Sequence, residues 1–334
     1  MALDVIYPKH CPELRAEVVN FLKADGPCGG ANMLSWLDSG EDYGALRAFG
    51  PSEREKLAAA AAARRMAASI GIAELFIIAK HKVKDVLEAA GELPLDMVAQ
   101  RHWFHTDHGI MFFEKPILMN AFSKTAETQQ TTPIAAISWM IYGDMMRVTA
   151  WADTSKFLGL TAKVIPDALG ERPVPLRDVR KVVAAVGPLI VCASFVSSVS
   201  GLMGHVRDED DPRHPLRVLL CAVLMLKQTV TARSVVDAPR SSWRRINSIN
   251  PQLGKSVTVI DKRDVKRNPT NEGGESPSSR VLSVRYDRRG HWREYKSERF
   301  SPEMREHPIW IPAHWVGHEG LPLATRSKVT RLTR

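Results

Sequence analysis

Three apolar segments, HGIMFFEKPI (108–117), TPIAAISW (132–139) and RVTAWAD (147–153), decide the fold expected for the middle of this 334-residue chain. Each is rich in aromatic and β-branched residues, and prolines interrupt the first and open the second, a pattern typical of β-strands. Because the tight turn Tyr142-Gly143-Asp144 separates the last two, we expect antiparallel pairing in chain order. The region 109–151 is therefore predicted to form an antiparallel β-meander.

Helices are expected on both sides of this meander. Ser52-Glu53-Arg54-Glu55 has the form of a capping box and precedes an alanine-rich run, 57–68, of high helix propensity. A further helix is predicted over 73–89, where apolar positions recur at three- and four-residue steps, and apolar helices are predicted over 179–204 and 215–236. The predicted fold class is α+β: a mainly helical body with a small antiparallel meander, plus a small C-terminal antiparallel β-module.

The predicted domain organisation follows the changes in composition. Residues 1–246 are expected to form the helical body with its inserted meander. Residues 247–280 combine a basic strand candidate, 256–260, with a linker of low hydrophobicity. Residues 281–334 form the expected C-terminal basic β-module.

The uncharged stretch 182–204 is long enough to cross a bilayer. Glycines, a proline and four serines dilute its apolar character below that of a membrane helix, so a buried segment is the favoured interpretation and a membrane span the alternative. The four cysteines lie far apart without a C-x-x-C pair or a preceding signal peptide, which favours a reducing cytoplasm. These cysteines are Cys11, Cys28, Cys192 and Cys221.

Positive charge is concentrated in the last third of the chain. Residues 1–232 carry 25 Lys and Arg against 26 Asp and Glu, whereas residues 233–334 carry 21 against 11. Clustered positive charge favours polyanionic partners, because neutralising phosphates releases their condensed counterions. Nucleic acid, either RNA or DNA, is therefore the expected partner, and a basic surface that only aids solubility is the alternative.

The segment VLSVRYDRRGHWREY (281–295) alternates on both sides of Asp287-Arg288-Arg289-Gly290. This predicts a hairpin with Gly290 at the left-handed position of a bulge. Cross-strand pairing would then place a carboxylate beside an imidazole, with two guanidiniums and a phenol on the same face. These residues are Asp287, His291, Arg285, Arg293 and Tyr295.

The polar face of this hairpin suits either phosphate binding or metal-independent phosphodiester cleavage. In an endoribonuclease of the toxin or effector kind, His291 would be the general acid or base and Asp287 would orient it. Arg285 and Arg293 would stabilise the phosphorane, and Tyr295 or Glu294 would be a second proton-transfer group. The alternative is a solvated sheet face whose opposite charges only pair.

Histidines cluster twice, within 102–108 and within 291–318. The first group is expected in a loop, and the second contains Gly317 and prolines, so neither would hold two ligands on one helix face. No metal and no cofactor are therefore expected. Ile309 and Ile311 alternate with Trp310 as an additional strand would.

Nucleic-acid contacts are expected from basic side chains beyond residue 240, together with an aromatic ring and an imidazole of the terminal module. The expected set is Arg244, Arg245, Lys262, Arg263, Arg285, Arg288, Arg289, Trp310 and His314.

With the three meander segments and LRVLLCAVLMLKQ (216–228), the motifs GHWREY (290–295) and HPIWIPAHWVG (307–317) give the chain a family resemblance. It resembles a family of uncharacterised proteins of actinobacteria and their mobile elements that end in a similar GHWR…IWI-P-H…G signature. The resemblance implies a bacterial or phage cytoplasmic setting and supplies no mechanism.

The expected function is that of an accessory protein of a bacterium or mobile element that binds nucleic acid through its basic C-terminal module. Two hypotheses stay open beside it: a metal-independent endoribonuclease using His291 and Arg293, and a non-catalytic protein-interaction module. Whether the protein is an enzyme is therefore an open question at this level.

Overall fold

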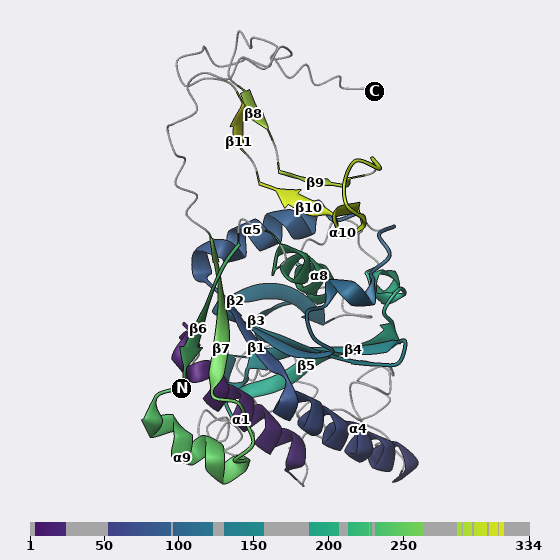
Figure 1. Cartoon of the computed structure of the whole chain (residues 1–334). Coiled ribbons are helices and arrows are strands. Elements are labelled where there is room, and N and C mark those ends of the chain that lie inside the picture. Colours follow the sequence, from purple (N-terminus) through teal and green to yellow (C-terminus); the bar gives the residue numbers. More distant parts are fainter. Residues whose placement is uncertain are drawn as a thin grey trace. The chain divides into compact units, whose positions relative to one another are not determined.

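The structure is a computed structural model of the chain. It divides into two compact units, Met1–Arg263 and Asp264–Arg334 (Figure 1). The residues that it describes are 4–24, 53–94, 96–122, 130–156, 187–206, 213–226, 228, 231–262, 286–288, 290–295, 297–305, 307–312 and 314–316.

A seven-stranded mixed sheet forms the centre of the first unit, with the strand order β5-β4-β3-β2-β1-β7-β6. Strand β1 lies parallel to β2 and to β7, and the other pairings in the sheet are antiparallel. The strands are β1 (Glu74–Ile78), β2 (His108–Phe122), β3 (Gln130–Tyr142), β4 (Met145–Asp153), β5 (Leu189–Ser198), β6 (Thr231–Asp237) and β7 (Ser256–Lys262).

Helices cover both faces of this sheet (Figure 1). On one face α5 (Lys80–Gly91) and α8 (Pro215–Leu226) contact each other and β2. On the other, α1 (Cys11–Lys23) packs against α4 (Glu53–Ile72) and α9 (Arg240–Ile249). The first unit is thus a three-layer α/β/α arrangement. Short 3-10 helices are η1 (Pro8–His10), η2 (Arg101–Trp103) and η3 (Leu202–His205).

The predicted α+β class with a mainly helical body is wrong, because three segments predicted as helix contain strands. Strand β1 lies within 73–89 and β5 within 179–204, and β6 begins within 215–236 and ends at Asp237. Segments such as LFII (75–78) and LIVCA (189–193) are continuous apolar runs in which every residue is buried. A strand covered on both faces loses the alternation that would distinguish it from a buried helix.

Several other elements are confirmed. Strands β2, β3 and β4 pair antiparallel in chain order, as predicted for the meander, and β5 extends it by a fourth strand. The helix expected after the capping box is α4, the strand candidate 256–260 is β7, and the first part of 215–236 is α8.

The meander depends on a close approach between β2 and β3. Gly109 lies opposite Trp139, and a Cβ at position 109 would overlap the Trp139 ring. The ring is held there because its Nε1 donates a hydrogen bond to the Thr106 carbonyl at 2.9 Å and its face stacks on Phe76, with 5.9 Å between centroids. Position 109 therefore has room for glycine only.

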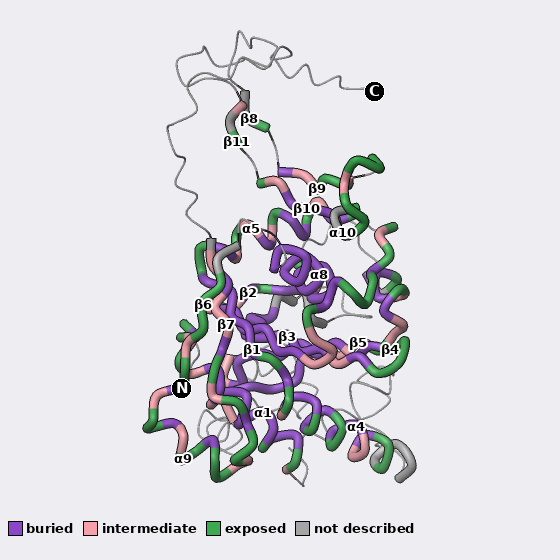
Figure 2. The backbone as a smooth tube through the Cα atoms, in the orientation of Figure 1, coloured by how far each residue is buried: buried purple, intermediate pink, exposed green. Residues whose placement is uncertain are grey.

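The core includes the central strands and all of α8, each of whose twelve residues is buried (Figure 2). An arginine is also buried, in α1: Arg15 is 2% exposed and donates a hydrogen bond of 3.2 Å to the Ala73 carbonyl and another to the Gly254 carbonyl. Burial lowers the pKa of Arg15 to about 10. Arg15 joins α1 to the α4–β1 and α9–β7 connections.

No helix within the described ranges has both the length and the apolar character needed to cross a membrane. In the apolar stretch 182–204, residues 189–198 form strand β5.

The second unit contains short strands and one helical turn. They are β8 (Tyr286–Arg288), β9 (His291–Arg293), α10 (Pro302–Arg305), β10 (Ile309–Ile311) and β11 (His314–Val316). The strand predicted around Trp310 is confirmed as β10.

Candidate nucleic-acid interface

The strands of the second unit form two antiparallel pairs. Strand β9 pairs with β10 so that His291 faces Ile311, and β8 pairs with β11 so that Arg288 faces His314. Arg288 lies three residues before His291, and His314 lies three residues after Ile311, so the two strand pairs have the same register. We call residues 286–293 with 309–316 the terminal ribbon.

This pairing differs from the hairpin predicted at Asp287–Gly290. Asp287 lies opposite Trp315, and His291 lies opposite Ile311, so Asp287 and His291 follow one another along the same side of the ribbon. The expected cross-strand pair of carboxylate and imidazole is therefore not formed, because the downstream segment 309–316 supplies the partner strand instead.

Two tryptophans form the packed face of the ribbon. Trp292 and Trp310 lie directly opposite one another, with ring centroids 5.5 Å apart. Trp310 is only 2% exposed, and among the described residues its indole Nε1 has no hydrogen-bond partner. Trp310, expected to contact nucleic acid, is therefore a core residue in this structure rather than a platform on which a base could stack.

The opposite face of the same segment carries His291 and Arg293. His291 is half-buried and Arg293 exposed. The Arg293 guanidinium lies over the Tyr295 ring, 4.9 Å from its centroid, and that ring packs against Phe300 at 4.5 Å. Three residues of the predicted catalytic set, His291, Arg293 and Tyr295, are thus close together in the chain and in space, whereas Asp287 belongs to the other half of the ribbon.

The other half presents Arg288 and His314 on facing positions, and both side chains are exposed. His314 Nδ1 lies 2.9 Å from the Pro312 carbonyl, an acceptor, so Nδ1 is the donor and a neutral His314 keeps Nε2 as an acceptor. The Arg288 guanidinium can donate hydrogen bonds to a phosphate group, and His314 can donate one through Nε2 only when its ring is protonated.

The basic residues of α9 belong to the first unit and differ in their surroundings. Arg244 is exposed. Arg245 Nε lies 2.6 Å from Glu17 and 3.7 Å from Glu13, both in α1. The hydrogen bond from Arg245 to Glu17 raises the pKa of Arg245 above its ordinary value. The positive charge of Arg245 is already balanced by these two carboxylates, so this side chain links α9 to α1.

The remaining expected contacts fall at or outside the limits of the described chain. Lys262 is the last residue of β7, facing Thr231 of β6. Arg263, Arg285 and Arg289 lie outside the described residues.

The histidine group at 102–108 has separate partners for its members. His108 Nδ1 lies 2.8 Å from the Ser69 hydroxyl, His105 is 3.9 Å from Glu74, and Asp107 accepts two hydrogen bonds from Arg101, at 3.2 and 2.6 Å. Within the described part of the chain, no three His, Cys, Asp or Glu side chains converge as metal ligands would.

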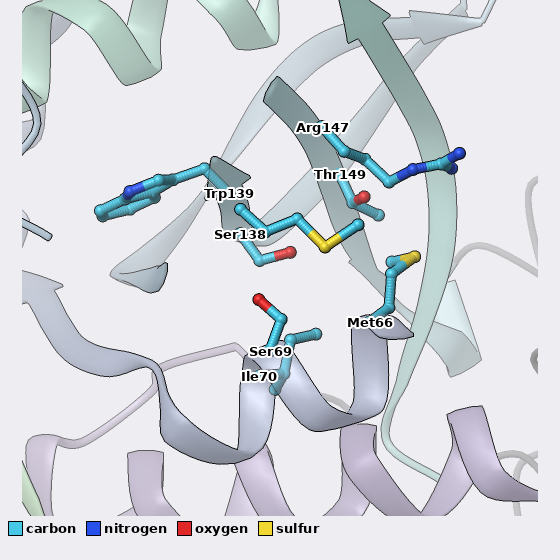
Figure 3. A pocket seen from close by; sticks show the side chains of 8 residues that line it. Met66, Ser69, Ile70, Ser138, Trp139, Arg147 and Thr149 are labelled. Carbon is cyan, nitrogen blue, oxygen red and sulfur yellow. The ribbon is translucent and has the colours of Figure 1, made fainter. Parts of the chain in front are cut away.

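A small pocket that the sequence did not indicate lies between α4 and the sheet (Figure 3). Ser69 and Ser138 point toward one another across it. Ser138 accepts a 2.9 Å hydrogen bond from Trp151 Nε1, Ser69 bonds to His108, and Arg147 donates to Ser194 at 2.9 Å. Since these groups already have partners within the protein, the pocket is a feature of the packing.

No protein-family model, curated protein or solved structure matches the chain.

Proposed function

We propose that the protein binds nucleic acid through the terminal ribbon, with Arg288, Arg293 and His314 contacting the phosphate backbone. The observation that carries this proposal is the exposure of all three side chains on the short strands β8, β9 and β11 of the terminal ribbon. A two-stranded antiparallel ribbon fits the major groove of duplex DNA, and exposed arginines provide binding that does not depend on base sequence.

The charge of the second unit supports the same proposal. Residues 264–334 carry 14 Lys and Arg against 9 Asp and Glu, an excess of five positive charges in 71 residues. A positive field of this kind attracts polyanions before contact is made. The Arg293 guanidinium is supported by the Tyr295 ring.

Binding is favoured over cleavage because of the separation between Asp287 and His291. A general base needs a partner group within hydrogen-bond reach to orient it, and in the backbone register Asp287 faces Trp315 whereas His291 faces Ile311, which favours binding. Incubating RNA with the wild-type protein and with His291→Ala tests this distinction. Cleavage by wild type but not by the variant would replace the binding proposal with the nuclease hypothesis.

The proposal is tested by fluorescence anisotropy with labelled RNA and DNA. Replacing Arg288 and Arg293 together by Gln removes two phosphate contacts and should weaken binding about tenfold or more at moderate salt. Arg64→Gln with Arg65→Gln is the matched control, because it removes the same charge from exposed positions on α4. Equal weakening by both pairs would mean that net charge, rather than the ribbon, governs binding.

A further inference from the structure

Strand β6 forms one edge of the seven-stranded sheet. Its side chains from Arg233 to Asp237 are exposed or half-buried, and Val235 is 69% exposed. Among the described residues, no strand pairs with the outer side of β6. The short helix η1 contacts β6 and β7 together, so it lies over a face of the sheet and not along this edge.

The backbone groups that point away from the sheet can be assigned. Ala238 N donates a hydrogen bond to the Lys255 carbonyl, toward the β7 side. Because N–H and C=O groups alternate in direction along an antiparallel strand, the even-numbered residues of β6 bond to β7 and the odd-numbered ones point outward. The backbone N–H and C=O groups of Arg233, Val235 and Asp237 therefore point outward.

An unpaired edge of this kind can accept another strand, and the charges on β6 select one register. Pairing two copies of β6 antiparallel about Val235 places Arg233 of each copy opposite Asp237 of the other. Centring the pair on Arg233 would oppose two arginines, and centring it on Asp237 would oppose two aspartates. Opposite charges at facing positions stabilise a strand pair, and like charges destabilise it.

We propose that β6 is the contact through which two copies of this chain associate, with their sheets continuous across a two-fold axis at Val235. About six backbone hydrogen bonds would form, between the facing pairs 235–235, 233–237 and 237–233. Arg233 and Asp237 each form a hydrogen bond within the protein through one atom, and their other polar atoms can form the proposed contact. Arg233 uses Nη2 for the Leu226 carbonyl, and Asp237 uses Oδ1 for the Ser256 hydroxyl at 2.7 Å.

Charged residues on an edge strand can also serve to prevent such pairing, and the two roles give opposite results in solution. Sedimentation equilibrium of the full chain from about 1 to about 200 μM should show a monomer–dimer equilibrium, because a contact this small supports micromolar affinity. A protein that stays monomeric throughout this range would overturn the proposal.

Charge exchange tests the register. Arg233→Asp and Asp237→Arg should each raise the dimer dissociation constant about tenfold or more, and combining them should restore dimerisation, since the facing pairs become opposite again. Val235→Pro removes an outward N–H that β7 does not use, so it should give a folded monomer. Persistent dimerisation of Val235→Pro, with wild-type circular dichroism, would exclude β6 as the contact.

A cross-link gives a readout that does not depend on charge. Val235 faces itself on the two-fold axis, and hydrogen-bonded antiparallel partners have Cα atoms about 5.5 Å apart, within the range of a disulfide. In a Cys28→Ser background, Val235→Cys should form a disulfide-linked dimer under mild oxidation. Ile72→Cys, with a similar exposure of 72%, is the control. Equal cross-linking of both variants would contradict the proposed contact.

Discussion

At the scale of single residues, Gly109 shows how the meander depends on a missing side chain. The Trp139 ring occupies the volume that a Cβ at 109 would fill, and its hydrogen bond to Thr106 and its stacking on Phe76 prevent it from moving aside. The ring and the glycine therefore fix the spacing of β2 and β3 together.

Replacing Gly109 by Ala should lower the free energy of unfolding by about 2 kcal/mol, because overpacking a close contact forces the backbone or the ring to shift. Thermal unfolding measures this effect. Gly204→Ala is the control, since a Cβ at 204 meets nothing within 4 Å, and it should change stability by no more than about 0.5 kcal/mol. Similar losses for both variants would show that Trp139 does not impose the constraint.

The described cysteines, Cys11, Cys192 and Cys221, are free and buried. Burial favours the neutral thiol and raises the pKa of each above its ordinary value, so the reactive thiolate is scarce at pH 8. A thiol-specific reagent at pH 8 should therefore modify at most one of the four thiols in the native protein, and all four after denaturation. Rapid native reaction of two or more would contradict the described burial.

At the scale of elements, the terminal ribbon depends on the facing pair Trp292 and Trp310. Removing the Trp310 ring should destabilise the ribbon by about 3 kcal/mol, since it leaves a cavity against Trp292. In Trp310→Ala, hydrogen exchange should become faster in 286–293 and 309–316 and stay unchanged in β1 to β5. Trp243→Ala, in α9, should leave the ribbon protected. Unchanged exchange in the ribbon of Trp310→Ala would show that this pair does not hold it together.

The elements that the sequence predicted correctly are those whose signals are local. A capping box marks the start of α4, and the turn at Gly143, with a φ of 60°, joins β3 to β4. Strands β1, β5 and β6 were missed because what distinguishes them is the neighbouring strand, which a local pattern does not identify. The same reason applies to the ribbon: alternation identified β9 and β10, but the predicted partner of His291 was Asp287, whereas its partner in the fold is Ile311.

At the scale of the whole molecule, the unit boundary divides the basic third of the chain. Residues 233–263 belong to the first unit and 264–334 to the second, and each segment carries a net charge of +5. In the first segment, Arg245 is compensated by Glu17 and Glu13, and Arg233 bonds to a backbone carbonyl. Composition predicted the total charge, whereas the fold determines which of these charges can reach a partner.

Binding by the ribbon is tested most directly by a salt titration on one RNA and one DNA of equal length. For wild-type protein the logarithm of the association constant should fall linearly with the logarithm of salt concentration, and replacing Arg288 and Arg293 by Gln should reduce the slope by about 1.4 to 1.8, whereas the Arg64 and Arg65 control should leave it unchanged. An affinity that does not depend on salt, or the same slope for wild type and the ribbon variant, would contradict nucleic-acid binding through the terminal ribbon.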